Sequence, residues 1–533
     1  MISTIDALII GIYIIGMMLI GWKLGKNNES SEDYFLAGRN MPWVPIAFSV
    51  AATTISANGF IGGPGWAYTS GISPYMVQVA IPLAIFIIMV TTIPVLYNLK
   101  LTSIYEYVEM RLGVRTRILA VIGFLANSII QISSMVFIPS LILKTFTGWD
   151  LKIVVPIIVV SAIVYTLLGG IKAVIWTDFI QMIVMWCGLI ISIVLILKSL
   201  NMGFFDTLSV AKGAGKLNAI NFTFDISETN GFWVTLIGGT VLWVRYFGFD
   251  QAQVQRILTA KSMKDVKKSF AISAFVTNII YFAFMILGVF LFIFYKGREF
   301  DNANNIMIDF ISNNLPVGVV GIILAGVFAA AMSSVDSLLN SMSTVFVKDI
   351  YERFFTKKRN KQTSLKESMI ISLIWGIIII IVTVLGFSGT TKSVLDVVGS
   401  YISYISGPMC AVFILGLFTE KANDKGTTLG TILGFIITIL VGKKVIMSWI
   451  LRPAVGFIIT FILGYLFSLI LKSDRKRKDI RKFTVLGQRK RLMEKCSSEE
   501  NDLSVLPLKI DKYAWIVLGF FIFQYIFFII IAL

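Results

Sequence analysis

Long apolar runs alternate with short polar stretches along the whole chain. About fourteen runs can be distinguished, and they lie near 5–22, 43–69, 74–97, 117–143, 153–169, 173–197, 232–254, 270–295, 316–347, 367–388, 394–418, 426–442, 451–470 and 513–533. A helix needs about 20 apolar residues to cross the hydrocarbon core of a bilayer, so each run can supply one crossing. The pattern predicts an all-α polytopic membrane protein with about 14 transmembrane helices. The first run has no basic stretch before it and no small-residue cleavage site, so we expect a retained helix rather than a signal peptide.

The composition agrees with a membrane protein and excludes several other classes. Of the 533 residues, 56% are hydrophobic and 14% are charged, whereas soluble domains have about 45–50% apolar residues and a quarter charged ones. The chain contains no histidine, which excludes catalysis and metal binding by that side chain. Its cysteines, Cys187, Cys410 and Cys496, are too far apart to indicate a metal cluster or a disulfide framework. We expect a protein that is not an enzyme.

The net charge of +17 would suggest a nucleic-acid partner in a soluble protein. In a membrane protein, Lys and Arg gather in the cytoplasmic loops. If both termini are extracellular, the inner loops hold roughly three times as many Lys and Arg residues as the outer ones. We therefore expect a multi-pass protein of the cell membrane with both termini outside, no nucleic-acid partner and no obligate protein partner. The basic stretch 472–495 is interpreted as a solvated cytoplasmic loop rather than a site for anionic lipid.

Several ionisable residues fall within or near the ends of the apolar runs. An ionised side chain at the centre of a bilayer costs at least about 2.5 kcal/mol, so each one needs a partner or a hydrated pathway. Ion pairs between helices would explain one or two of them, but five residues of mixed sign favour a hydrated route. They are Asp178, Arg245, Asp250, Asp336 and Asp396.

Two of the runs are interrupted by small and polar residues. The second run has the polar centre 51–59 followed by Gly62-Gly63-Pro64-Gly65, and this Gly/Pro cluster favours a broken helix over a continuous, closely packed one. The seventh run contains Gly238-Gly239-Thr240 and then the segment 244–251, which carries two charges. It follows the second run by five runs, an odd number, so two halves with opposite topology are predicted.

The ninth run places polar side chains on one helical face. Ser333, Asp336, Ser337 and Asn340 are spaced at i, i+3, i+4 and i+7. Hydroxyl and carboxylate oxygens suit a hard cation such as Na⁺. Small polar residues at a helix contact are the alternative, but a carboxylate is a poor packing residue and favours the cation.

Five segments together resemble the sodium:solute symporter family, and the resemblance covers almost the whole chain. They are DYFLAGRNMPW at 33–43, LTSIYEYVEMRLG at 101–113, YTLLGGIKAVIWTDFIQ at 165–181, DQAQVQR at 250–256 and MSSVDSLLNSMSTVFVKDIY at 332–351. The multivitamin, monocarboxylate and iodide branch is the most similar, followed by bacterial sialic acid and sugar symporters.

This resemblance implies a leucine-transporter-type fold with a five-plus-five inverted repeat. The first repeat would span 43–198 and the second 232–418, separated by an extracellular loop at 199–231. The N-terminal helix and first cytoplasmic loop would occupy 1–42, and accessory helices 419–471. A basic cytoplasmic loop at 472–510 and a C-terminal helix at 511–533 would complete the chain.

The resemblance also implies a Na⁺ site between the first broken helix and the ninth run. Its oxygens would come from the carbonyls of Ala52, Ile55 and Ala330 and from the hydroxyls of Ser333 and Ser334. Some members of the family bind a second Na⁺ through an aspartate and nearby serines. Here that set would be Asp178, Ser333, Asp336 and Ser337, and Asp336 replaces a serine of the sialic acid pattern.

The substrate positions of the family fall on Thr54, Ser56, Gly59, Gln78, Gln131 and Asp250. The sialic acid pattern has an arginine at the position of Gln131, and the sugar branch has a glutamate at the position of Gln78. Arg245 is unusual within its run, and because a guanidinium matches a carboxylate in two places, it is a candidate for anion recognition. An ion pair of Arg245 with Asp250 or Asp178 is the alternative and remains open.

We therefore expect a Na⁺-coupled symporter that imports a small organic solute by alternating access. Arg245 favours an anionic solute such as sialic acid or another monocarboxylate. A Na⁺/neutral sugar symporter and a sensor built on the transporter fold are the alternatives.

Overall fold

The computed structural model describes residues 3–25, 31–355, 365–386, 394–471, 480–495 and 510–532, and this part is built of helices. An isolated bridge between Met41 and Ala260 is its only β-type pairing in these ranges. Cys496, most of the loop predicted at 472–510 and the side chain of Asp396 lie outside the described residues.

Twelve helices in the described ranges are long and apolar enough to cross a membrane. They are α1 (Thr4–Gly25), α5 (Met76–Val90) with the turn before it, α8 (Val114–Thr147), the second part of α9 (Leu151–Leu200), α11 (Phe232–Phe249), α13 (Met263–Phe294), α15 (Val319–Val345), α17 (Leu365–Gly386), α18 (Val394–Phe418), α19 (Asp424–Lys444), α20 (Arg452–Ile470) and α22 (Lys512–Ala532). The bent pair α3 (Trp43–Thr54) and α4 (Ala57–Ser70) adds a thirteenth span if it crosses as one unit. A multi-pass helical membrane protein is thus confirmed, whereas the predicted number of about 14 helices remains a prediction.

The shorter helices lie between these spans. They are α2 (Ser31–Leu36), α6 (Thr92–Asn98), α7 (Ile104–Arg111), α10 (Phe204–Gly213), α12 (Gln251–Leu258), α14 (Ala303–Asn314), α16 (Glu352–Phe354) and α21 (Val485–Lys495).

The fifth and sixth apolar runs meet inside α9. Gly170 has φ 59° and ψ −163°, which divides α9 into the shorter apolar helix Leu151–Val164 and the longer part that follows. A Cβ atom at Gly170 would approach the carbonyl oxygen of Tyr34 to 2.6 Å. Glycine is therefore required here both by the positive φ and by the close approach of α2.

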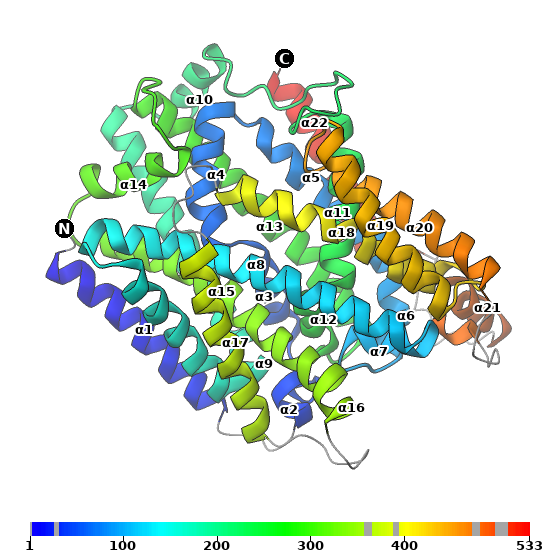
Figure 1. Cartoon of the computed structure of the whole chain (residues 1–533). Helices are drawn as coiled ribbons and strands as arrows, with labels where there is room; N and C mark the ends of the chain where they lie inside the picture. The colour runs from blue at the N-terminus through cyan, green and yellow to red at the C-terminus, as the bar shows by residue number, and fades with distance from the viewer. Residues whose placement is uncertain are drawn as a thin grey trace.

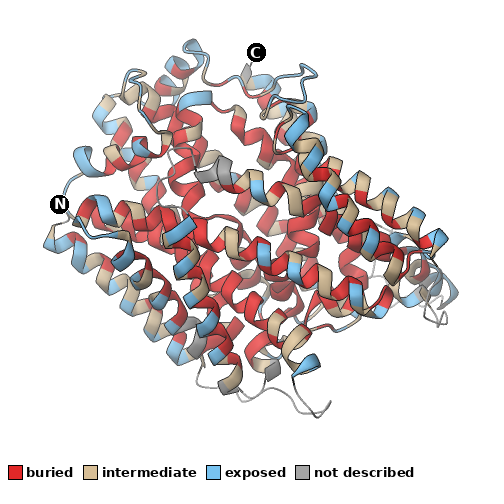
Figure 2. Cartoon of the chain, viewed as in Figure 1, coloured by how far each residue is buried: buried red, intermediate tan, exposed pale blue. Residues whose placement is uncertain are grey.

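α15 occupies the centre of the molecule. In the most apolar window of this span 89% of the residues are buried, compared with 22% in α1 at the periphery. α15 packs against α9, α8, α1 and the bent pair α3–α4, while α19 and α20 pack against each other at one edge (Figure 1). Buried residues are concentrated in this central group of helices (Figure 2). Polar groups on α15 are therefore shielded from bulk solvent by several layers of helices.

The first break lies in the polar centre 51–59 of the second run and not in the Gly/Pro cluster that follows it. Helix α3 ends at Thr54 and α4 begins at Ala57, with a bend of 58° between them, whereas residues 62–65 lie within α4. A Cβ atom on Gly65 would come within 2.3 Å of the carbonyl oxygen of Ala303. The glycines of this cluster therefore serve close helix packing, and the polar centre of the run forms the break.

The second break also differs from the glycine positions. Gly238 and Gly239 lie within α11, and the helix stops at Asp250, whose φ of −96° and ψ of 127° are extended. A Cβ atom on Gly238 would meet the carbonyl oxygen of Ile450 at 2.1 Å, which explains the small residue there by packing. Asp250 Oδ1 then accepts a hydrogen bond from the Ala252 amide (3.0 Å) and caps α12.

Candidate functional site

The break between α3 and α4 exposes backbone carbonyls in the middle of the protein. Ile55 and Ser56 have extended backbone angles, so the helical hydrogen-bond ladder ends with the Ile55 amide, which donates to the Ala51 carbonyl at 3.1 Å. The hydroxyls of Thr53 and Thr54 donate to the carbonyls of Ser49 and Val50, at 2.8 and 2.9 Å, which further loosens the end of α3.

Four carbonyls at this break divide into two pairs. Tyr246 Oη donates to the carbonyl of Thr53, and Tyr281 Oη donates to that of Thr54, each at 3.0 Å. The carbonyls of Ala52 and Ile55 face α15 instead. The tyrosines from α11 and α13 satisfy the first pair. In the second pair, the Ala52 carbonyl accepts a hydrogen bond from the Ile55 amide at 3.1 Å, and both carbonyls lie close to serine hydroxyls of α15.

The five oxygens of the predicted first Na⁺ site lie together between α3 and α15. Ser333 Oγ is 3.4 Å from the Ala52 carbonyl oxygen and 3.2 Å from that of Ala330. Ser334 Oγ is 3.5 Å from the Ile55 carbonyl oxygen and 3.3 Å from that of Ala330. These contacts are long for hydrogen bonds from a hydroxyl. A compact cluster of neutral oxygens with no soft ligand is the donor set that a hard cation prefers.

The residues predicted for a second Na⁺ are divided between two environments. Ser333 belongs to the cluster just described, while Asp178 and Ser337 contact the guanidinium of Arg256. Asp178 Oδ2 is 3.2 Å from one terminal nitrogen of Arg256. Asp336 Oδ1 lies 3.2 Å from Ser337 Oγ. All of these side chains are buried.

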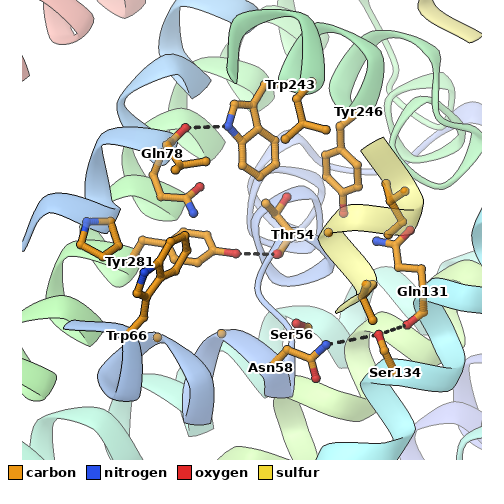
Figure 3. A pocket seen from close by; sticks show the side chains of 18 of the residues that line it. Thr54, Ser56, Asn58, Trp66, Gln78, Gln131, Ser134, Trp243, Tyr246 and Tyr281 are labelled. Carbon is orange, nitrogen blue, oxygen red and sulfur yellow. Dashed lines mark hydrogen bonds between the residues drawn. The ribbon is translucent and has the colours of Figure 1, made fainter. Parts of the chain in front are cut away.

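A cavity of about 200 Å³ lies beside the break, between α4, α5, α8, α11 and α18. Six of the seven predicted substrate residues line it, namely Thr54, Ser56, Gly59, Gln78, Gln131 and Arg245. Gln78, Trp66 and Tyr281 stand on one side of the cavity and Gln131 and Ser134 on the other (Figure 3). The seventh, Asp250, does not line the cavity and contacts Arg245.

Most of the cavity wall is apolar or aromatic, and its polar groups are few. Asn58 Nδ2 donates to Ser134 Oγ at 3.2 Å, and Ser134 Oγ donates to the Gln131 carbonyl at 2.7 Å (Figure 3). Asn58 Oδ1 and Gln78 Oε1 are buried and have no hydrogen-bond partner among the described residues. A solute with hydroxyl or amide donors would satisfy these two oxygens.

Arg245 combines the two roles that the sequence left open. One of its terminal nitrogens lies 3.0 Å from Asp250 Oδ2, so the predicted ion pair is present. The same side chain lines the cavity, and its Nε has no hydrogen-bond partner within the described residues. Arg245 is the only charged residue of the cavity wall in this part of the chain. An ion pair with Asp250 therefore leaves a donor of the guanidinium available to a bound anion.

Sequence reasoning missed the polar side chains of α12 and the two tyrosines. All eight residues of α12 are buried. Gln255 Nε2 donates to the Phe35 carbonyl at 2.8 Å and to Asn340 Oδ1 at 3.0 Å, which joins α12 to α2 and α15. The cluster of glutamines in DQAQVQR was a usable signal, because three amides and an arginine in one short helix need buried partners.

Comparisons with known proteins agree with this geometry. The chain is 28% identical to the sodium/sialic acid symporter NanT of Aliivibrio fischeri, over 90% of this chain and 95% of the relative. It is 30% identical to the sodium/sialic acid symporter SiaT of Proteus mirabilis, over 80% and 86% of the two chains. Mouse sodium-coupled monocarboxylate transporter 1 is 30% identical over 80% of this chain and 72% of its own.

Solved structures give the same result for the fold. A substrate-bound, outward-open Na⁺-coupled sialic acid symporter has a TM-score of 0.79 and 28% identity, covering 89% of this chain and all of the other. Mhp1, a nucleobase-cation-symport-1 family transporter, shares the fold at 13% identity, with a TM-score of 0.55 over 81% of this chain and 93% of its own.

These relatives are transporters, as expected of a chain that is not an enzyme, and Na⁺ is the coupling ion. The model of the sodium:solute symporter family matches residues 34–434, about three quarters of the sequence. The resemblance drawn from the five segments is thus confirmed, and the chain belongs to the sodium:solute symporter family.

Proposed function

We propose that the solute carried by this Na⁺-coupled symporter is a small organic anion, such as sialic acid or another monocarboxylate. The observation that carries the proposal is Arg245, a buried guanidinium in the cavity wall with a nitrogen that makes no hydrogen bond to the described residues. A buried cation attracts an anion strongly because little water screens the two charges. The relatives named for sialic acid and monocarboxylate transport support the same class of solute.

The rest of the cavity is suited to the uncharged part of such a solute. Gln78 and Gln131 are neutral amides, so Arg245 supplies the positive charge. Trp66, Trp243 and Trp449 provide flat apolar surface. We expect the carboxylate to bind beside Arg245, and hydroxyl or amide groups of the solute to donate to Gln78 and Asn58.

Transport would then follow from the position of the Na⁺ site. A cation held by the carbonyls of Ala52 and Ile55 and by the serines of α15 joins the broken helix to α15. The next residues of the broken helix, Thr54 and Ser56, line the cavity. Na⁺ binding from outside would order these cavity residues, solute binding would close the outer path, and both would be released inside after the helices move.

The architecture that we propose for this cycle is the five-plus-five inverted repeat, with repeats at 43–198 and 232–418. Both segments begin with a helix that breaks, at Ile55 and at Asp250, which is the pattern expected of such repeats. We place the protein in the cell membrane with both termini outside, on the distribution of Lys and Arg over the loops.

Uptake into proteoliposomes tests the anionic solute. We expect labelled N-acetylneuraminate or pyruvate to accumulate with an inward Na⁺ gradient, and much less with an equal K⁺ gradient. Arg245→Gln should raise the KM for the acid by about ten- to a hundredfold, since a hydrogen bond to a charged group contributes about 1.5–3 kcal/mol. Arg245→Lys should have a smaller effect, because lysine keeps the charge but loses the planar fork.

A second variant separates binding from folding. Arg245→Gln alone leaves Asp250 buried without its cation, which costs stability. The double variant Arg245→Gln, Asp250→Asn removes both charges, so it should be better folded and still have the raised KM for the acid. The proposal would be rejected if either variant kept the wild-type KM for the acid. It would also be rejected if the wild-type protein took up a neutral sugar and neither acid.

A further inference from the structure

Arg256 is one of the largest fully buried side chains of the described residues. It lies on α12, the short helix after the second break, and its side chain extends into the space between α3, α9 and α15. An arginine cannot lose its proton in a protein, so a full positive charge is held in the interior of the molecule. Such a charge must be balanced by oxygen atoms close by.

Every nitrogen of the guanidinium has a partner. Nε donates to Ser49 Oγ at 2.7 Å, and one terminal nitrogen donates to the Ala252 carbonyl of the preceding turn. The other terminal nitrogen contacts both Asp178 Oδ2, at 3.2 Å, and Ser337 Oγ. Ser49 Oγ also donates to Asp178 Oδ2, at 2.5 Å. All the nitrogens of this guanidinium are therefore used, in contrast to Arg245, which lines the cavity and whose Nε has no hydrogen-bond partner within the described ranges.

Two of the four residues that the family resemblance assigned to a second Na⁺ contact Arg256, and a third, Asp336, lies 3.2 Å from one of them, Ser337. Asp178 and Ser337 bind the guanidinium, and Ser333 points to Ala52 and Ala330 of the first site. A Na⁺ on Asp178 Oδ2 and Ser337 would compete with the guanidinium for the same oxygens. Asp178 Oδ1 has no hydrogen-bond partner within the described residues, but a Na⁺ there would still be repelled by the adjacent guanidinium. A Na⁺ entering this pocket would have to lose its hydration water and break a buried ion pair, and breaking such a pair is costly. Asp178 therefore binds Arg256 in preference to Na⁺.

We infer that Arg256 is the permanent cation of the Asp178–Ser337 pocket and that the protein binds a single Na⁺, at the site formed by Ala52, Ile55, Ala330, Ser333 and Ser334. The inference concerns the number of ions and rests on the proposed function only for the location of that single Na⁺. Removing the guanidinium while keeping the carboxylate should convert the pocket into a second Na⁺ site, because a carboxylate and two hydroxyls are hard oxygen ligands.

Equilibrium binding of ²²Na⁺ to the purified full-length protein tests this, and it needs no solute. We expect one Na⁺ per chain for the wild type and two for Arg256→Gln. In the double variant Arg256→Gln, Asp178→Asn the number should return to one, because the carboxylate that pairs with position 256 is gone and Asp336 is the only carboxylate of the predicted set that remains. Arg256→Lys, which keeps a positive charge, should also bind one.

Two Na⁺ in the wild type would overturn the inference, as would a single Na⁺ in a folded Arg256→Gln variant. If that variant does not fold, the numbers of Na⁺ bound by the wild type and by Arg256→Lys still test the inference. Two bound Na⁺ in a protein with a cation at position 256 would show that this cation does not exclude the second ion. The variant Ser333→Ala, Ser334→Ala serves a separate purpose. If this variant still binds one Na⁺, the first Na⁺ site must lie elsewhere. The exclusion of Na⁺ from the Asp178–Ser337 pocket by Arg256 would be unaffected.

Discussion

At the scale of single residues, two buried arginines close in sequence have opposite tasks. Arg245 keeps part of its guanidinium for the cavity, and Arg256 uses all of its donors on protein oxygens. The sequence drew attention to Arg245 because it stands within an apolar run. Arg256 lies just beyond that run, where a basic residue usually indicates the cytoplasmic end of a helix. Position along the chain therefore could not show that α12 turns back into the protein.

The paired hydroxyls of α15 give the sharpest test at this scale. Replacing Ser333 and Ser334 together with alanine removes two of the five oxygens of the proposed Na⁺ site. We expect the Na⁺ concentration for half-maximal uptake to rise at least tenfold, since each lost ligand costs about 1 kcal/mol or more. Initial uptake rates measured against external Na⁺ would show the change.

A serine on the same helix provides the control. Ser343 is buried, and its Oγ donates to the Leu339 carbonyl at 2.9 Å, away from the broken helix. Ser343→Ala should keep the wild-type dependence on Na⁺. Unchanged Na⁺ dependence in the double variant, with normal protein levels in the liposomes, would show that these hydroxyls do not bind the ion.

At the scale of helices, the sequence predicted which runs break and named the segments that contain the breaks, 51–59 and 244–251, but not the exact residues. Glycine and proline supported the prediction that these runs break, yet 62–65 and 238–240 are themselves helical and closely packed. The actual breaks occur at Ile55 and Asp250, where partners from other helices satisfy the backbone. Such partners come from distant parts of the chain, so a local pattern cannot reveal them.

The same limit explains the outcome for the site. The resemblance to the family implies the five oxygens near Ser333 and five of the six cavity residues, and Arg245 is indicated by its charge within an apolar run. Tyr246 and Tyr281 were not predicted, because a tyrosine in an apolar run looks like any other packing residue. Their hydroxyls matter only once α11 and α13 are placed beside the break.

Removing these two hydroxyls should loosen the broken helix. Tyr246→Phe and Tyr281→Phe each leave a buried carbonyl of Thr53 or Thr54 without its donor, which costs about 1–3 kcal/mol. We expect lower thermal stability and, because the adjacent carbonyls belong to the proposed Na⁺ site, a smaller stabilisation by added Na⁺. Thermal unfolding in Na⁺ and in K⁺ would measure both effects.

Tyr97 offers a matched comparison, since its hydroxyl donates to the Ala260 carbonyl at 3.0 Å, far from the break in sequence. Tyr97→Phe should lower stability by a similar amount and leave the Na⁺ effect unchanged. Equal loss of the Na⁺ effect in all three variants would mean that the tyrosines at the break have no special connection with the ion.

At the scale of the whole molecule, the charge carried across the membrane depends on the number of bound ions. Asp178 and Arg256 belong to the protein, and their charges cancel within the pair. One Na⁺ and one monovalent anion then add up to zero net charge for each cycle. Two Na⁺ with the same anion would move one positive charge inward. The resident guanidinium therefore determines whether the membrane potential contributes to transport.

This difference can be measured as the final accumulation of the solute. A charge moved through 100 mV releases about 2.3 kcal/mol, which corresponds to roughly fiftyfold accumulation. With one Na⁺, we expect an inside-negative potential of that size, set by K⁺ and valinomycin, to leave the accumulation of a monocarboxylate unchanged at a fixed Na⁺ gradient. Doubling the Na⁺ ratio should double it, because the accumulation follows the first power of that ratio for one ion and the square for two. An increase of tens of times with potential, together with a fourfold response to the Na⁺ ratio, would establish two ions and remove Arg256 from its proposed role.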